Sequence, residues 1–367
     1  MRILLLSAYD GTSHRYWRQG LVDNLGEHQW TVLTLPGRYF SWRIRGNPLS
    51  WLVTEPERLS AEYDLIVATS MVDIATLKGL FPNLARTPTL CYFHENQFEY
   101  PQRDKGKRPL EAMMVNLYSA LASDCLLFNS QYNQDSFFDG ADRLMKQLPD
   151  FKPKSIRELL TKKSRVLPVP INNPADAGEC SQKADVFTLV WNHRWEHDKA
   201  PERLYLLLQK LHEAAISFRL HLLGECFRDE PETISMIKAE FADNLGCCGY
   251  QADKESYWRC LGESHLVLST SVHEFQGLAV LEGVAAGAVP VVPDRLSYRE
   301  MFAEQYRYQS HIQNTQSEAQ AMADKIVQLY RQWVELGHLK APSVSGFYWT
   351  HLREKYRQQI GQTQAMM

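Results

Sequence analysis

Short apolar runs alternate with segments of helical periodicity along nearly the whole chain of 367 residues, and this alternation limits the possible folds. Short, continuous runs of aliphatic and β-branched residues indicate strands buried on both faces, as in parallel sheets. In the first half we expect strands at residues 2–9, 30–35, 65–70, 89–93, 125–129 and 165–169. In the second half we expect them at 187–192, 218–223, 245–249, 265–270 and 289–293. The pattern predicts an α/β protein with two doubly wound domains in succession.

The periodicity breaks between residues 168 and 184, where prolines, asparagines and a glycine gather. We therefore expect an N-terminal domain at 1–170, a linker or hinge at 171–185 and a second domain at 186–340. Beyond residue 293 the alternation stops, and amphipathic stretches at 317–337 and 347–360 predict long helices. The last segment, 341–367, is expected to be a C-terminal helix that packs back on the protein.

The net charge of −3 argues against a protein that coats nucleic acid without specificity. Residues 1–170 nevertheless carry 21 Lys and Arg against 18 Asp and Glu, so this half is the better candidate for an anionic partner.

No run approaches 18 apolar residues, and the seven cysteines include no C-x-x-C pair. Cys91, Cys125, Cys247 and Cys248 lie in apolar runs, so we expect core residues in a reducing compartment, hence a cytoplasmic protein.

The segment 273–292, H-E-F-Q-G-L-A-V-L-E-G-V-A-A-G-A-V-P-V-V, carries the strongest local signal. A loop with Glu274 follows an expected strand, and a helix begins near Gly277, where backbone N–H groups could hold a phosphate. Glu282, five residues into this helix, could accept hydrogen bonds from both hydroxyls of a ribose, with Glu274 at the other end of the ligand. Alternatively, Glu282 is an ordinary surface residue and Gly277 a plain turn.

The segment W-N-H-R-W-E-H-D-K at 191–199 also follows an expected strand. Arg194 offers a guanidinium fork and Lys199 a point charge, a pair suited to a diphosphate, although an exposed charged loop would look the same. His193 and His197 complete H-x-x-E-H, an inverted zinc-protease motif that needs both histidines on one helix. Because the next helix is expected only near residue 200, zinc hydrolysis is disfavoured.

In the first half, His94 follows the expected strand 89–93, where a doubly wound sheet places catalytic groups. Gly11 lies in the loop after the first strand and would allow close approach of the backbone. Neither a G-x-G-x-x-G fingerprint nor a Walker phosphate loop is present.

Basic stretches occupy residues 38–45, 103–108 and 152–165. The first interleaves arginines with aromatic residues, as stacking on unpaired bases requires. The last could equally contact an anionic membrane surface, and each stretch alone could be a solvated face. Three such stretches in one domain favour an anionic macromolecular acceptor.

The spacings E-x7-E of Glu274 and Glu282, R-x4-K of Arg194 and Lys199, and G-x-x-P-V from Gly287 resemble the donor-binding domain of retaining GT-B glycosyltransferases of family 4. Longer motifs, Y-F-H-E-N-Q, W-x-H-R-W-E-H-D-K, L-G-E and H-E-F-x-G-x-A-x-L-E, are similar over nearly the full length to the tRNA-queuosine α-mannosyltransferase family. Two departures affect only loop conformation: His193 replaces the usual Gly, and Asn172-Asn173 replaces Asn-Gly.

This resemblance implies two Rossmann-like domains facing across a cleft, and transfer of mannose from GDP-mannose to queuosine in a tRNA anticodon with retained configuration and no metal or cofactor. The residues implied in catalysis are His94, Arg194, Lys199 and Glu274. Those implied in donor binding are Gly11, Arg194, Lys199, Phe275, Gln276, Gly277, Leu278 and Glu282. Those implied in tRNA binding are His14, Arg38, Trp42, Arg43, Asn96, Arg103, Lys105 and Lys107.

Within this resemblance, Arg194 and Lys199 bind the diphosphate, Glu282 binds the ribose, and Glu274 with residues 275–277 holds the sugar. His94 contacts the sugar from the other domain. Three alternatives stay open: a lipid or polysaccharide acceptor, a nucleotide-sugar-binding protein without turnover, and a glycosidase-like carboxylate pair. The tRNA isoacceptor and the oligomeric state are not indicated by the sequence.

Overall fold

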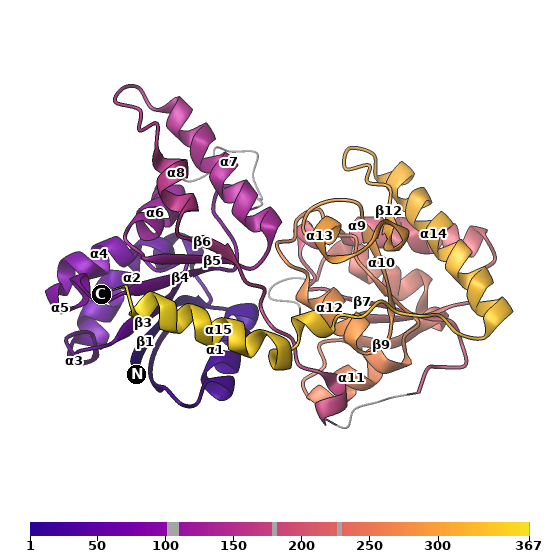
Figure 1. Cartoon of the computed structure of the whole chain (residues 1–367). Coiled ribbons are helices and arrows are strands. Elements are labelled where there is room, and N and C mark those ends of the chain that lie inside the picture. The colour runs from indigo at the N-terminus through magenta and orange to yellow at the C-terminus, as the bar shows by residue number, and fades with distance from the viewer. Residues whose placement is uncertain (101–109, 178–181, 226–229, 367) are drawn as a thin grey trace. The chain divides into compact units, whose positions relative to one another are not determined.

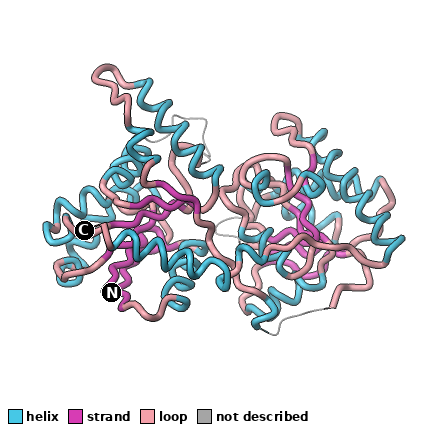
Figure 2. Tube along the Cα trace, viewed as in Figure 1, coloured by secondary structure: helices cyan, strands magenta, loops and turns pink. Residues whose placement is uncertain are grey.

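The computed structural model describes residues 1–100, 110–177, 182–225 and 230–366. The chain forms two compact units, Met1–Pro170 with Trp349–Met367, and Ile171–Tyr348. Each unit contains a six-stranded sheet, with helices packed against it (Figures 1 and 2). All strand pairs in both sheets are parallel, which confirms the predicted α/β class with two doubly wound domains. No helix within the described ranges combines the length and apolarity needed to cross a membrane.

The first unit has the strand order β2-β1-β3-β4-β5-β6. Its strands are β1 (Arg2–Asp10), β2 (Gln29–Pro36), β3 (Leu65–Thr69), β4 (Thr89–Phe93), β5 (Cys125–Phe128) and β6 (Ser164–Val166). Its helices are α1 (Thr12–Asn24), α2 (Phe40–Thr54), α3 (Pro56–Leu59), α4 (Ile74–Leu80), α5 (Pro82–Ala85), α6 (Leu110–Leu121), α7 (Gln131–Gln147), α8 (Ile156–Thr161) and α15 (Trp349–Gln364). The central strands β3, β4 and β5 are buried at every residue, as their continuous apolar sequences predict.

The second unit has the strand order β12-β11-β10-β7-β8-β9. Its strands are β7 (Thr188–Asn192), β8 (Arg219–Leu223), β9 (Leu245–Gly249), β10 (Leu266–Leu268), β11 (Val289–Pro293) and β12 (Arg307–Tyr308). Its helices are α9 (Pro201–Glu213), α10 (Glu232–Glu240), α11 (Lys254–Glu263), α12 (Leu278–Ala285), α13 (Tyr298–Met301) and α14 (Thr315–Leu336). Short 3-10 helices are η1 (Pro174–Ala177), η2 (His197–Lys199), η3 (Ala242–Asn244), η4 (Glu304–Tyr306) and η5 (Ser345–Phe347).

The order of the second sheet brings distant parts of the chain together. From β7 the chain proceeds outward to β8 and β9, then returns to the other side of β7 to form β10. The carboxyl ends of β7 and β10 are therefore neighbours, and the loops that follow them diverge. Ligands of doubly wound sheets bind at such a crossover.

The prediction for the cysteines is correct for two of the four. Cys91 and Cys125 are buried in β4 and β5, as expected. Cys248 is exposed, so placing it in the core was wrong, whereas Cys247 is half-buried and packs against the core of the second unit. Both residues lie on β9, an edge strand whose alternate residues face solvent.

The last helix, α15, belongs to the first unit and packs beside α1 (Figure 1). Its Tyr356 hydroxyl accepts the indole N–H of Trp17 at 3.0 Å and lies 3.0 Å from the carbonyl oxygen of Pro168. A Cβ on Gly20 would lie 2.4 Å from the ring of Trp349, so a glycine allows this close packing. Of the predicted C-terminal segment 341–367, residues up to Tyr348 lie in the second unit instead.

Replacing Tyr356 by Phe removes the acceptor for the buried N–H of Trp17, so the free energy of unfolding should fall by about 1–3 kcal/mol. Urea denaturation followed by Trp fluorescence measures this loss. The control is Tyr118→Phe, because Tyr118 is exposed on α6 and its change should leave stability unaltered. Equal stability of both variants would contradict the assigned packing of α15.

Candidate functional site

The loops that follow β7 and β10 form a charged cluster at the crossover of the second sheet. Lys199 ends η2, and Glu274 lies between β10 and α12. The Lys199 ammonium is 3.0 Å from Oε2 of Glu274, 3.1 Å from Oδ2 of Asp198 and 3.1 Å from the carbonyl oxygen of His273. These three acceptors match the three donors of an ammonium group, so the buried Lys199 is fully paired within the protein.

The charges of this cluster stabilise one another. Burial alone would raise the pKa of Glu274, but the Lys199 ammonium outweighs burial and holds that pKa at about 2. Burial lowers the pKa of Lys199, yet Glu274 and Asp198 together keep it above its usual value. Oε1 of Glu274 also accepts the backbone N–H of Phe275 at 3.1 Å. Glu274 is therefore an ionised carboxylate held in one orientation.

Gly277 precedes α12 and has a left-handed backbone with a φ of 83°. A Cβ at this position would lie 2.8 Å from the ring of Tyr298, whose hydroxyl is 2.8 Å from Oγ of Ser269. Glycine thus allows α12 to begin at Leu278, as the sequence predicted. The first-turn N–H groups of a helix have no intrahelical acceptor, so this end of α12 is suited to a phosphate.

The other residues of the loop before α12 contribute less through their side chains. Phe275 and Gln276 are buried, and the ring of Phe275 packs edge-on against His273 with 4.5 Å between the centroids. Leu278 is partly buried at the start of α12. Any contact of Phe275 or Gln276 with a donor is therefore expected from the backbone.

Glu282 lies in a polar chain between α12, α11 and β7. The hydroxyl of Tyr257 donates to Oε2 of Glu282 at 2.6 Å, and Nδ2 of Asn192 donates to the Tyr257 hydroxyl at 3.1 Å. Burial raises the pKa of Glu282 to about 7, and the Tyr257 hydrogen bond opposes this only in part. Glu282 is therefore not an ordinary surface residue, which was the alternative that the sequence left open.

Arg194 and His193 follow β7 but differ in exposure. The side chain of Arg194 is 43% exposed, and its guanidinium lies 3.3 Å from Glu196. His193 is buried, its Nε2 has no hydrogen-bond partner, and burial together with the Lys199 charge lowers its pKa to about 4. His193 precedes η2 and His197 begins it, so the H-x-x-E-H motif does not place both histidines on one helix.

In the first unit, His94 follows β4 and is enclosed by aromatic rings. His14 stacks on it with 4.3 Å between the centroids, and the rings of Trp17 and Tyr92 lie at 4.9 and 4.7 Å. Nε2 of His14 is 3.0 Å from Oε2 of Glu95. His94 thus lies where the sequence placed it, at the carboxyl edge of the first sheet, and its contact with a donor stays a prediction.

Several residues predicted to bind tRNA are better explained by the fold. Asn96 is fully buried, and its amide bonds to Asn133 and Ser136 and accepts two backbone N–H groups, so it stabilises the loop instead of facing a ligand. His14 is also buried. Gly11, which was predicted to let the backbone approach the diphosphate of the donor, caps α1 with a φ of −69°, and this contact stays a prediction.

The basic and aromatic residues at the start of α2 are accessible. Arg38 and Trp42 are exposed and Arg43 is partly buried, in agreement with a role at the surface. The Arg38 guanidinium lies 5.5 Å from the ring centre of the exposed Tyr39. The other predicted tRNA contacts, Arg103, Lys105 and Lys107, lie outside the described residues.

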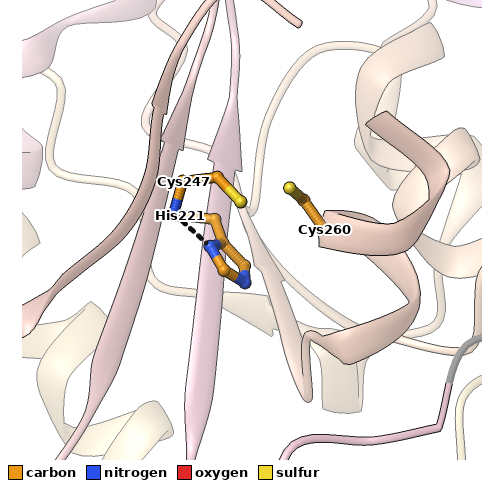
Figure 3. Close-up of side chains that lie close together, drawn as sticks. All are labelled: His221, Cys247 and Cys260. Carbon is orange, nitrogen blue, oxygen red and sulfur yellow. Dashed lines mark hydrogen bonds between the residues drawn. The ribbon is translucent and has the colours of Figure 1, made fainter. Parts of the chain in front are cut away.

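His221, Cys247 and Cys260 form the one cluster of potential metal ligands within the described part of the chain (Figure 3). Nδ1 of His221 accepts the backbone N–H of Cys247 at 2.8 Å, and its Nε2 lies 3.4 Å from Glu263. Structural zinc takes four ligands, and this group offers two thiols and one imidazole. We interpret it as a polar contact that joins β8, β9 and α11.

Comparison with known proteins establishes the relationship of the chain. A family model described as tRNA-queuosine alpha-mannosyltransferase N-terminal matches residues 2–171, and one described as Glycosyl transferases group 1 matches residues 180–340. The tRNA-queuosine alpha-mannosyltransferase of Drosophila melanogaster is 34% identical over 315 residues, which are 83% of either chain. The chain belongs to the tRNA-queuosine α-mannosyltransferase family. It is therefore a glycosyltransferase, as the sequence predicted.

Solved structures confirm the GT-B fold of this family member. Sucrose-phosphate synthase from Thermosynechococcus elongatus matches with a TM-score of 0.68, 16% identity and complete coverage of both chains. Anabaena HepE in complex with UDP matches with a TM-score of 0.64 and 14% identity, over 99% of this chain and 100% of that one. A glycosyltransferase from Rickettsia africae matches with a TM-score of 0.63 and 13% identity, over 99% and 98%.

The sequence did not identify three groups that contact predicted site residues within the two units. Asp198 shares the Lys199 charge, and Tyr257 bonds to Glu282 from a different helix. Glu95 pairs with the buried His14. Asp198 and Glu95 lay within the recognised motifs and so carried a signal, whereas nothing in the sequence marked Tyr257.

The raised pKa of Glu282 predicts a stability that depends on pH. The folded state binds more protons than the unfolded state between pH 4.5 and about 7, so stability falls as pH rises through this window. Glu282→Gln removes this loss. The free energy of unfolding of the variant minus that of the wild type should therefore be roughly 2–3 kcal/mol larger at pH 8 than at pH 5. Urea denaturation at both pH values measures the difference. Glu255→Gln on the exposed face of α11 is the control; because this variant keeps Glu282, its stability should change between the two pH values as that of the wild type does.

Proposed function

We propose that this chain transfers mannose from GDP-mannose to the cyclopentenediol of queuosine in a tRNA anticodon, with retention of the anomeric configuration. The observation that carries the proposal is the Lys199–Glu274 pair beside the start of α12, in a chain that belongs to the tRNA-queuosine α-mannosyltransferase family. This pair places fixed charges where a doubly wound sheet binds nucleotides.

The diphosphate of the donor would bind at the start of α12. The unpaired N–H groups of its first turn and the exposed guanidinium of Arg194 are donors for phosphate oxygens. Departure of the nucleotide develops negative charge on that phosphate, and fixed donors stabilise this charge more in the transition state than before it. Lys199 holds Glu274 in place.

The two carboxylates would hold opposite ends of the donor. Glu282 offers oxygens to the ribose hydroxyls, and Tyr257 fixes its orientation. Glu274, held as a carboxylate, accepts hydrogen bonds from sugar hydroxyls. We expect neither a metal ion nor a cofactor in the reaction, because Arg194 and the start of α12 supply donors for the leaving group. His94 would contact the sugar from the first unit.

The acceptor surface would include the start of α2. The indole of Trp42 is 52% exposed, and Tyr39 is exposed beside Arg38. Exposed aromatic rings next to guanidinium groups suit stacking on unpaired anticodon bases and contact with their phosphates. A tRNA substrate would place the enzyme in the cytoplasm, and neither a lipid nor a polysaccharide acceptor explains this combination of rings and charges as well.

Nucleoside mass spectrometry tests the whole proposal. After incubation with GDP-mannose and queuosine-containing tRNA, queuosine should gain the mass of one hexose. The matched control is the same tRNA with guanosine in place of queuosine, which should gain nothing. Transfer to the control, transfer only to lipid extracts, or no transfer with bound GDP-mannose would each contradict the proposed acceptor.

Loss of one preorganised donor should slow transfer without unfolding the chain. For Arg194→Ala we expect kcat to fall by about 10²–10³, the range found when a fixed donor to a developing charge is removed. Arg331→Ala, which removes an exposed arginine of α14, should retain full activity. Initial rates of hexose transfer at saturating donor give kcat for both variants and the wild type. Circular dichroism checks that both variants are folded.

A further inference from the structure

The buried pair of His14 and Glu95 lies next to His94 in the first unit, and the proposed chemistry gives it no role. Nε2 of His14 is 3.0 Å from Oε2 of Glu95, and the imidazoles of His14 and His94 are nearly parallel, at 24°, with centroids 4.3 Å apart. His14 is 4% exposed and His94 5% exposed. The two rings therefore form one buried stack.

Contacts from several elements fix the ring of His94. The backbone carbonyl of His94 accepts Nδ2 of Asn129 at 2.8 Å. The ring meets the edge of Trp17 at 85° on α1 and the tilted ring of Tyr92 on β4. Nε2 of His94 is buried without a hydrogen-bond partner in the protein. A buried polar atom without a partner in the protein calls for an explanation, and a hydrogen bond from a substrate hydroxyl would supply one.

The charges around the two rings favour one distribution of protons. Burial lowers the pKa of His14, but Glu95 and then Asp10 more than compensate, so the pKa of His14 is raised. Burial and the His14 charge both lower the pKa of His94, to well below its usual range. Asp10 is itself bound by the guanidinium of Arg18 at 3.1 and 2.9 Å, which leaves Glu95 as the main partner of His14.

The remaining titratable groups near the two rings do not alter this distribution. Arg15 on α1 lies 3.6 Å from Asp10 and is largely exposed. Tyr92 on β4 and Tyr356 on α15 are buried phenols whose pKa values burial raises, so both are neutral. Among the described residues whose rings contact His94, His14 is therefore the basic one, and Glu95 is its partner.

We propose that His14 and Glu95 are positioning residues for the transfer reaction: the His14 ring, anchored by Glu95, stacks on the ring of His94 and fixes its orientation and its protonation state. An uncharged imidazole with an unpaired nitrogen accepts a hydrogen bond from a hydroxyl of the sugar or the acceptor, which an imidazolium cannot do. This inference rests on the proposed function, because it deepens the role proposed for His94.

The pH profile of kcat/KM in Glu95→Gln and His14→Gln tests the proposal. Removal of His14 removes the ring that opposes a proton on His94, and removal of Glu95 lowers the pKa of that ring, so in both variants His94 gains a proton more readily. The acid limb of the profile should move to higher pH in both variants. His28→Gln is the matched control, because His28 also lies beside a glutamate, at 3.9 Å in the same unit, but away from His94. Its profile should match that of the wild type.

A uniform loss of kcat with an unchanged pH profile would overturn the proposal and assign the pair a purely structural role. Should the variants fail to fold, the imidazole NMR titration of the labelled wild-type chain gives the answer directly. His14 should titrate above His94, with the His94 signals assigned from His94→Gln. The reverse order would overturn the proposal. This titration needs no donor or acceptor, so its outcome is independent of whether the chain transfers mannose to queuosine.

Discussion

The buried ion cluster of Lys199 with Glu274 and Asp198 is the interaction on which the second unit depends at its functional edge. Lys199 and Glu274 are 75 residues apart in sequence, and the parallel pairing of β7 with β10 brings their loops together. Removing one partner would leave a charge buried without compensation, which costs several kcal/mol. The loops after β7 and β10 are thus held to one another before a ligand arrives.

The two glutamates of the E-x7-E spacing, Glu274 and Glu282, have different pKa values because their surroundings differ. Glu274 lies beside an ammonium and has a pKa near 2, whereas Glu282 has only a phenol as its partner and a pKa near 7. Two carboxylates whose pKa values differ in this way can have different roles in the same site. It weakens the alternative of a glycosidase-like pair, because both carboxylates have protein partners that already explain their positions.

Much of this arrangement could be predicted because local sequence determines it. The continuous apolar runs gave β3, β4 and β7 within about a residue of their observed ends, and Gly277 marked the start of α12. Parallel strands with short loops then place functional side chains at one edge, which made the region of Lys199 and Glu274 predictable. The exposure of Cys248 was not predictable, because an edge strand differs from a central one only in its position in the sheet.

Contacts between elements far apart in sequence account for what the sequence could not reveal. Tyr257 reaches Glu282 from another helix, and Tyr356 returns to Trp17 across 339 residues. The stacking of His14 on His94 depends on the packing of α1 against the end of β4, and no spacing in the sequence encodes it. Such contacts act on charge as well as on shape: the proton on His14 is stabilised by Glu95, 81 residues away, and through the stacked ring it disfavours a proton on His94. The chemical state of a residue that a motif identifies is therefore set by neighbours that the motif does not contain.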